Sequence, residues 1–216
     1  MDSKDFGDKY TENYKEQNRW QYYWYRWLVN TIIEETRGDK VLDLGVGHGI
    51  LPKNMPDKHF IGVDASPGMI KYAEKLENVE CMVSYIEDLE FEAETFDSVI
   101  SNLALDHVED QEKLAKKVYK WLRPGGKYVI GLHFKPTEDF MSKVKNKINN
   151  YPDNAEKFNQ SLKEFFDNAP EDYGEDRVHE YLFTTEEMKG FLEKAGFKVK
   201  VIPSYNERFA MIVGEK

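Results

Sequence analysis

Two kinds of hydrophobic pattern alternate along this chain of 216 residues. Short apolar runs are typical of buried parallel strands, and apolar residues repeated every three or four positions are typical of one helix face. The runs predict strands at 40–45, 59–64, 79–84, 97–102 and 127–133. Helices are predicted after Gly49, from Ser66 to about Leu76, and at about 110–121. This alternation favours an α/β fold with helices on both faces of a mostly parallel sheet.

The two ends of the chain differ from this middle part. Residues 1–17 are polar, and apolar residues from Asn18 to about Thr36 recur at helical spacing with many aromatics among them. This helix either packs on the sheet in the ordinary way or turns part of its aromatic face to a substrate pocket. Near the other end, Thr184 and Glu187 form a capping-box pattern that opens a helix ending at Gly196. Phe197–Ile202 and Phe209–Val213 then predict a closing antiparallel pair.

One segment interrupts the alternation of strands and helices. Residues 134–182 are rich in Lys, Asn and Asp and have too few apolar positions for a core of their own, although 154–168 predicts a helix. We interpret this segment as a lid-like insertion. The predicted organisation is therefore an N-terminal arm and aromatic helix at 1–38, followed by one α/β domain at 39–216 that carries the lid at about 134–182.

Candidate chemistry begins at the first predicted strand, which runs into a glycine-rich turn. Gly45, Gly47 and Gly49 alternate there, and the next strand ends in Asp64. Glycines allow a tight turn and close approach of a ligand, and an acid after the second strand can accept hydrogen bonds from a ribose. Position 50 is Ile, so the G-x-G-x-x-G pattern of pyrophosphate binding is displaced. The spacing favours another adenosyl ligand over a dinucleotide.

From these residues onward the chain resembles the class I S-adenosylmethionine-dependent methyltransferases. The resemblance is carried, in the family's order, by 41–49, 61–64, 85–91, 96–102, 122–126 and 195–197. It implies a Rossmann-like, doubly wound sheet of seven strands, mostly parallel with an antiparallel C-terminal strand. It also implies S-adenosylmethionine as cofactor, S-adenosylhomocysteine as product, no metal, and cofactor binding by Asp43, Gly45, Gly47, Gly49, Asp64, Ala65, Tyr85, Ile86, Glu87 and Asn102.

Several of these roles have an alternative. The resemblance places Asp43 near the cofactor's amino group and Asp64 on the ribose, but Asp43 could instead accept backbone N–H bonds from the loop, and Asp64 could cap the following helix. Where relatives often carry an acid for the adenine amino group, this chain has Tyr85. Either Glu87 reaches that amino group or Tyr85 lies against the adenine ring.

The acceptor side carries weaker signals. Candidate bases are His107, His133 and His179, because imidazole takes up protons near neutral pH; a structural or substrate-positioning role is the alternative for each, and His133 and His179 rank ahead of His107. The predicted substrate pocket is formed by Tyr10, Tyr14, Trp20, His107 and Tyr181. The acids at 106, 109 and 110 are typical of a solvated first helical turn, so no metal is expected.

Charge and composition narrow the partners. The formal net charge of −10 opposes nucleic-acid binding, which depends on Lys and Arg. No apolar run reaches membrane-spanning length, no signal-peptide pattern opens the chain, and the single cysteine cannot form an internal disulfide, so we expect a cytoplasmic protein without membrane contact. The leading hypothesis is methyl transfer to a small molecule. The alternatives are a protein or tRNA methyltransferase, an NAD-dependent oxidoreductase, and a non-catalytic cofactor-binding relative.

Overall fold

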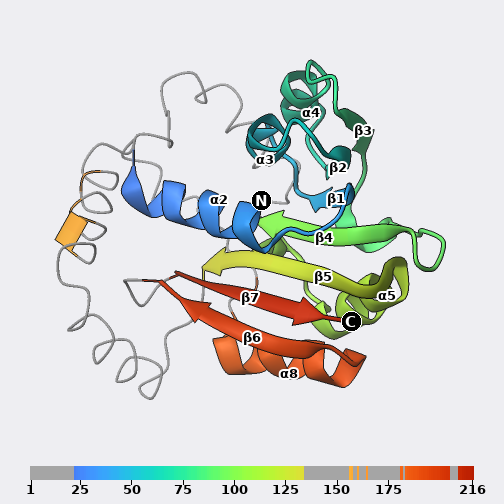
Figure 1. The fold of residues 1–216 in the computed structure, drawn as a ribbon, viewed down its shortest axis with the longest axis vertical. Coiled ribbons are helices and arrows are strands. Elements are labelled where there is room, and N and C mark those ends of the chain that lie inside the picture. Colours follow the sequence, from blue (N-terminus) through green and yellow to red (C-terminus); the bar gives the residue numbers. More distant parts are fainter. Residues whose placement is uncertain are drawn as a thin grey trace.

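The computed structural model of the protein describes residues 22–133, 183–204 and 209–216, together with the single positions 156, 157, 160, 164 and 181. Seven strands of these residues form one sheet in the order β3-β2-β1-β4-β5-β7-β6 (Figure 1). The first five strands pair in parallel, and β7 is antiparallel to both β5 and β6. The strands are β1 Lys40–Leu44, β2 His59–Asp64, β3 Val79–Val83, β4 Phe96–Asn102, β5 Leu122–His133, β6 Lys198–Pro203 and β7 Phe209–Glu215. The predicted fold class is confirmed.

The strand order reverses beside β1. The chain adds β2 and β3 on one side of β1 and then returns to add β4 and β5 on the other side. In open α/β sheets, ligands bind outside the carboxyl ends of the strands at such a reversal. The topology therefore directs attention to the loops that follow β1, β2 and β4.

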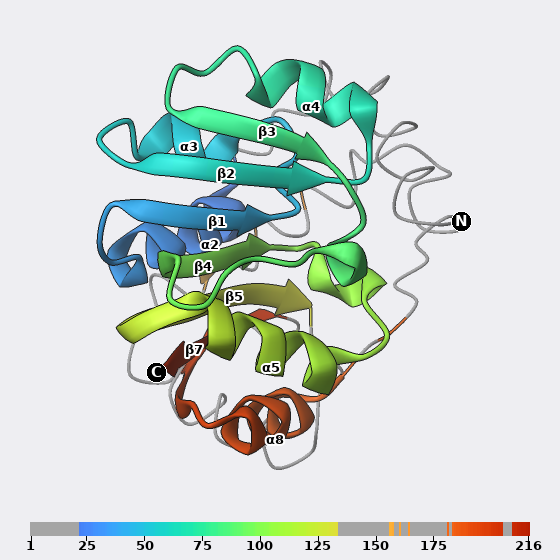
Figure 2. The same ribbon diagram turned by 90° about the vertical axis from the view of Figure 1, so that its right-hand side faces the viewer.

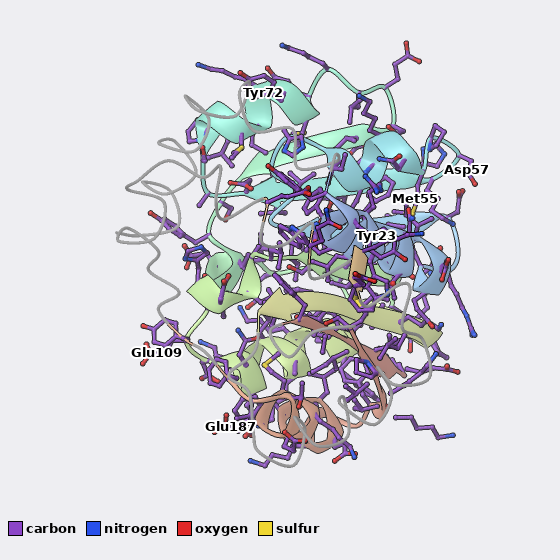
Figure 3. All side chains as sticks on the ribbon, turned by 90° about the vertical axis from the view of Figure 1, so that its left-hand side faces the viewer. Tyr23, Met55, Asp57, Tyr72, Glu109 and Glu187 are labelled. Atoms are coloured by element: carbon purple, nitrogen blue, oxygen red, sulfur yellow. The ribbon has the colours of Figure 1, made fainter. Side chains whose placement is uncertain are left out.

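Helices cover both faces of the sheet (Figure 2). One hydrophobic cluster joins the sheet to α5 and α8, and a second joins the opposite face to α2 and α3. Figure 3 views this second face, with Tyr23 on α2 in front of the sheet. The helices are α2 Tyr23–Glu35, α3 Ile50–Asn54, α4 Pro67–Ala73, α5 Gln111–Trp121 and α8 Thr185–Ala195, and the short 3-10 turns are η3 Ile86–Asp88 and η4 Leu105–His107.

Helix starts and stops follow the predicted caps. The Ser66 hydroxyl accepts a hydrogen bond from the Met69 backbone N–H at 3.2 Å and begins α4. Thr184 and Glu187 form the reciprocal capping box that begins α8. Gly196 ends α8 in the left-handed conformation with φ of 109°, which glycine adopts without a Cβ clash. Local sequence chemistry therefore fixes these boundaries.

Some boundaries differ from the prediction. The strand expected at 127–133 begins at Leu122 in the structure, because Leu122 pairs with Phe96 before the register shifts and Lys127 pairs with Ser98. The expected helix after Ser66 ends at Ala73 instead of Leu76. Residues 1–21 and most of 134–182 lie outside the described residues, so the arm, the lid and the division at residue 38 stay predictions. Positions 156, 157, 160 and 164, within the helix predicted at 154–168, are helical.

Candidate cofactor and acceptor site

A cavity of about 150 Å³ lies at the carboxyl ends of β1, β2 and β4. Most of the predicted cofactor residues that the structure describes line it, which brings together segments that are up to 60 residues apart in sequence. Tyr85 and Gly49 are not among the lining residues. Those that do line it are Asp43, Gly45, Gly47, Asp64, Ala65, Ile86, Glu87 and Asn102.

The glycine-rich loop brings the end of β1 against the end of β4. Gly45 has φ of 82°, and a Cβ added to it would lie 2.2 Å from the Ala104 Cβ. Only glycine therefore permits this contact between the two walls of the cavity. Gly47 also has a positive φ, but a Cβ there would meet nothing within 4 Å. Gly49 serves packing instead, because a Cβ would strike the Leu76 side chain at 2.7 Å.

Asp43 presents an unpaired carboxyl group to this cavity. Its side chain is buried, with 1% exposed, and neither of its oxygens has a hydrogen-bond partner among the described residues. Burial raises the pKa of this carboxyl well above its ordinary value, and the neighbouring charge of Asp64 raises it further. The alternative role of accepting backbone N–H bonds from the loop is not observed. A buried carboxyl without a partner is costly, so the site fits a ligand that supplies a donor or a positive charge.

Asp64 holds two loops together. One carboxylate oxygen accepts the Gly47 N–H at 2.9 Å and the other accepts the Ser66 N–H at 2.9 Å. The acid thus connects the glycine-rich loop to the start of α4. The loop-organising role considered for Asp43 falls to Asp64, which also lines the cavity.

The turn η3 supplies the wall beyond β3. Ser84, Ile86 and Glu87 line the cavity, whereas the Tyr85 side chain is 38% exposed and lies outside that lining. Of the two residues considered for this segment, Glu87 is the one that belongs to the lining, although it is exposed as well. The acidic residues of the lining are therefore Asp43, Asp64 and Glu87.

The loop after β4 supplies the remaining wall. The buried Asn102 Oδ1 has no hydrogen-bond partner among the described residues. Leu103 follows with a left-handed φ of 59° and also lines the cavity, while its N–H donates to the Gly131 carbonyl at 2.8 Å. Strained backbone of this kind is concentrated at binding sites.

The turn η4 brings one predicted acceptor residue into the cavity wall and another next to it. His107 lines the cavity, with 13% of its side chain exposed and its Nε2 4.0 Å from the Asp106 carboxylate. The Tyr181 N–H donates to the Asp106 carbonyl at 3.1 Å, so these two predicted pocket residues approach the same turn. The side chain of His133 and all of His179, Tyr10, Tyr14 and Trp20 lie outside the described residues; the His133 backbone ends β5 opposite Phe209.

Helix α2 packs on the sheet and also contributes one residue to the cavity wall. Trp24 is buried and stacks on Phe209 of β7 with centroids 4.9 Å apart, so it belongs to the ordinary helix–sheet core. The next residue, Tyr25, lines the cavity and was missed from the sequence. Its spacing to Leu28 and Ile32 on one helix face was the available signal.

The charges around the cavity are one-sided. Three acidic residues line it, and none of the described lining residues is Lys or Arg. Within the described part of the chain, no three His, Cys, Asp or Glu side chains are grouped to hold a metal. The described helices also include none that is both long and apolar enough to cross a membrane. Because acidic residues line the cavity and no described Lys or Arg does, the cavity suits a ligand with positive charge.

The fold and site together define a doubly wound α/β protein with a cavity at its topological reversal. A family model described as "Methyltransferase domain" matches residues 42–130. The chain is 34% identical over 127 residues to the "Uncharacterized methyltransferase YdaC" of Bacillus subtilis, covering 56% of this chain and 70% of that protein. The chain belongs to the class I S-adenosylmethionine-dependent methyltransferases. That assignment and the antiparallel β7 oppose the dehydrogenase alternative.

The chain has two further likenesses, one in sequence and one in fold. The chain is 33% identical over 138 residues to phosphoethanolamine N-methyltransferase 1 of Zea mays, and the aligned region covers 58% of this chain and 27% of that protein. It thus spans about a quarter of the length of that relative. The fold is similar to Haemonchus contortus phosphoethanolamine N-methyltransferase 2, solved with phosphomonomethylethanolamine and S-adenosylhomocysteine, with a TM-score of 0.61, 19% identity, and coverage of 87% and 52% of the two chains.

Proposed function

We propose that this chain transfers a methyl group from S-adenosylmethionine to a compact small-molecule acceptor that is uncharged or cationic. The observation that carries the proposal is the buried Asp43 carboxyl, which has no partner among the described residues and lies in a cavity lined by acids and by no described Lys or Arg, as the cationic cofactor requires. A cationic ligand is attracted to such a site, whereas a polyanion is repelled. The names of the phosphoethanolamine N-methyltransferase relatives support an amine as the acceptor class.

Residues of this chain divide between cofactor and acceptor in the proposal. S-adenosylmethionine supplies an electrophilic methyl group when bound. Asp43 would accept the hydrogen bonds of its ammonium group, and Asp64 would accept those of ribose hydroxyls while it keeps the glycine-rich loop in place. Asn102 has a free buried acceptor for a donor on either ligand. Glycines 45 and 47, Ala65, Ile86 and Glu87 complete the proposed cofactor wall, and Gly49 and Tyr85 are neighbours of lining residues in the chain.

The acceptor is proposed to enter beside η4. His107 and Tyr181 lie at this turn, and Tyr25 from α2 lines the cavity. A protonated amine must lose a proton before its nitrogen can attack, and a nearby imidazole can accept it. His133 and His179 stay candidates for that proton transfer, and Tyr10, Tyr14 and Trp20 stay candidates for the pocket. Alignment and exclusion of water are the other contributions that the walls would make.

The test measures S-adenosylhomocysteine release across a panel of acceptors. The panel contains apolar amines, phosphoethanolamine, a tRNA pool and a protein extract. We expect turnover with one or more small amines and weak turnover with phosphoethanolamine, because its phosphate would face the acidic cavity. Efficient methylation of tRNA or protein would overturn the small-molecule assignment. Calorimetric binding of S-adenosylhomocysteine without turnover on any acceptor would identify a non-catalytic relative, and preference for NAD would reject the cofactor.

A further inference from the structure

The turn η3 forms a cavity wall but holds itself together weakly. Its two internal backbone bonds, from Asp88 N to Tyr85 O and from Leu89 N to Ile86 O, are both 3.3 Å long. Backbone N–H···O bonds in proteins are commonly near 2.9 Å. The turn is also fixed by the buried side chains of Ile86 and Leu89, which anchor its two ends but leave Glu87 between them. A contact from outside the turn is therefore needed to hold the peptide at Glu87.

That contact comes from helix α5. The Lys117 ammonium donates to the Glu87 carbonyl at 2.9 Å and to the Leu89 carbonyl at 3.0 Å, and it pairs with the Glu90 carboxylate at 2.8 Å. An ammonium has three donors, and these three acceptors match them. Bonds from a charged donor are shorter and stronger than neutral ones. Lys117 thus holds the peptide at Glu87, which lines the cavity, and also the end of the turn at Leu89.

We propose that Lys117 is a positioning residue for cofactor binding, acting through η3 without touching the ligand. Lys117 is not among the cavity-lining residues, and its side chain is 18% exposed. The inference rests on the proposed function, because it assigns the Ile86–Glu87 wall to the cofactor. Two backbone carbonyls carry the effect. The ion pair adds little, since the Glu90 side chain is 70% exposed and an exposed pair is screened by water.

Three variants separate the clamp from charge and helix effects. Lys117→Met keeps the aliphatic stem and removes the donors. Lys116→Met is the matched control, because it makes the same change one position away, where the ammonium pairs with Glu112 on the surface. Glu90→Gln removes the ion pair and leaves both carbonyl contacts. All three chains are expected to fold, since none of these side chains belongs to the hydrophobic clusters.

The measurement is calorimetric affinity for S-adenosylhomocysteine, with amide hydrogen exchange of residues 84–90 in the free protein. For Lys117→Met we expect affinity about tenfold weaker and faster exchange in this segment, because the turn must be ordered when the ligand binds. The two other variants are expected to stay within about twofold of wild type. Melting temperatures check that each chain is folded at the temperature of titration.

The outcomes divide cleanly. Unchanged affinity for Lys117→Met would overturn the inference, and so would an equal loss in Lys116→Met. A lower melting temperature with unchanged affinity and unchanged exchange in 84–90 would mean that Lys117 contributes to overall stability alone, which also overturns it. Failure of the wild-type protein to bind S-adenosylhomocysteine would reject the proposed function instead. Exchange in 84–90 would then still decide whether Lys117 orders the turn.

Discussion

Asp97 and Asp43 lie near opposite ends of the neighbouring parallel strands β4 and β1, at the amino edge and the carboxyl edge of the sheet, and their carboxyl groups have opposite environments. At the amino edge, Asp97 in β4 accepts the backbone N–H groups of Asp39 and Lys40 at 3.0 and 2.9 Å and pairs with Arg123 at 2.7 Å. At the carboxyl edge, Asp43 is more deeply buried and its carboxyl has no partner among the described residues. The hydrogen bonds and ion pair of Asp97 stabilise the fold, whereas a buried carboxyl without a partner at a cavity indicates a ligand site.

The pKa values follow the same division. Burial tends to raise the pKa of Asp97, but the N–H groups of Lys40 and Asp39, together with Arg123, outweigh burial and leave the pKa lowered. For Asp43, burial raises the pKa and Asp64 adds to the rise. The amino edge therefore stabilises a charged carboxylate in the free protein. At the carboxyl edge, the Asp43 carboxyl is stabilised only when a ligand supplies a hydrogen-bond donor or a positive charge.

The largest expected effect comes from exchanging the two acids for their amides. Asp43→Asn should weaken S-adenosylhomocysteine binding by about 3 kcal/mol, since it removes one partner of a buried charge pair, and should not lower the free energy of unfolding, because the amide has no charge to bury. Asp97→Asn should do the reverse, lowering the free energy of unfolding by about 1–3 kcal/mol and leaving binding unchanged. Calorimetry and denaturant unfolding measure both. Loss of stability in Asp43→Asn with binding intact would reverse the comparison.

Asp64→Ala should have smaller effects on both ligand binding and stability, because this acid both lines the cavity and holds the fold together. It lines the cavity and also accepts two loop N–H groups. We expect binding to weaken by about 1.5–3 kcal/mol and the free energy of unfolding to fall by about 1 kcal/mol. Asp64→Asn retains one acceptor and should recover part of both. Unchanged calorimetric affinity in the alanine variant would remove Asp64 from the ligand site.

The sequence predicts the carboxyl-edge acids better than it predicts what they do. An apolar strand, three glycines and a second acid some twenty residues later place Asp43 and Asp64 at one edge, because parallel strands end together. The local sequence does not show whether the loop N–H groups donate to Asp43 or to Asp64, because that depends on the φ angles of the glycine-rich loop. The caps at Ser66 and Thr184 are predictable because their partners lie three residues away.

Long-range contacts account for most of what the sequence did not reveal. Lys117 reaches a turn some thirty residues earlier in the chain, and Ala104 meets Gly45 across two strands. Neither pairing has a sequence spacing that would indicate it. Tyr25 was missed for a different reason, because its neighbour Trp24 dominates the aromatic pattern although it faces the core. The spacing of apolar residues predicts which face of a helix is apolar, but the packing of that helix on the sheet determines which aromatic side chain lines the cavity.

A change of pH should alter the contributions of Asp97 and Asp43 to the free energy of unfolding in opposite directions. Asp97 has a lowered pKa, so its stabilisation is present above the ordinary value of 3.8 and is lost as pH falls through the folded-state pKa. Asp43 has a raised pKa, so the stability of its neutral buried form is complete below 3.8 and is lost as pH rises through the folded-state pKa. Because an amide does not ionise, Asp43→Asn should gain stability relative to wild type as pH rises above 3.8, measured by unfolding of the ligand-free protein. A constant difference between them would mean that Asp43 titrates normally.

The smallest expected effect concerns two residues that share a left-handed backbone but lie in different places. Leu103 has φ of 59° in the cavity wall, and Glu94 has φ of 55° in an exposed turn. Glycine relieves the strain at both positions, so Glu94→Gly should raise the free energy of unfolding by about 0.5 kcal/mol and leave ligand affinity unchanged. Leu103→Gly should gain no stability, because the partly buried side chain packs against the α2 cluster and the lost contacts offset the relief. It should also weaken S-adenosylhomocysteine binding about threefold through a loosened wall. A stability gain at Leu103 equal to that at Glu94, with affinity intact, would show that the strain at the site has no part in binding.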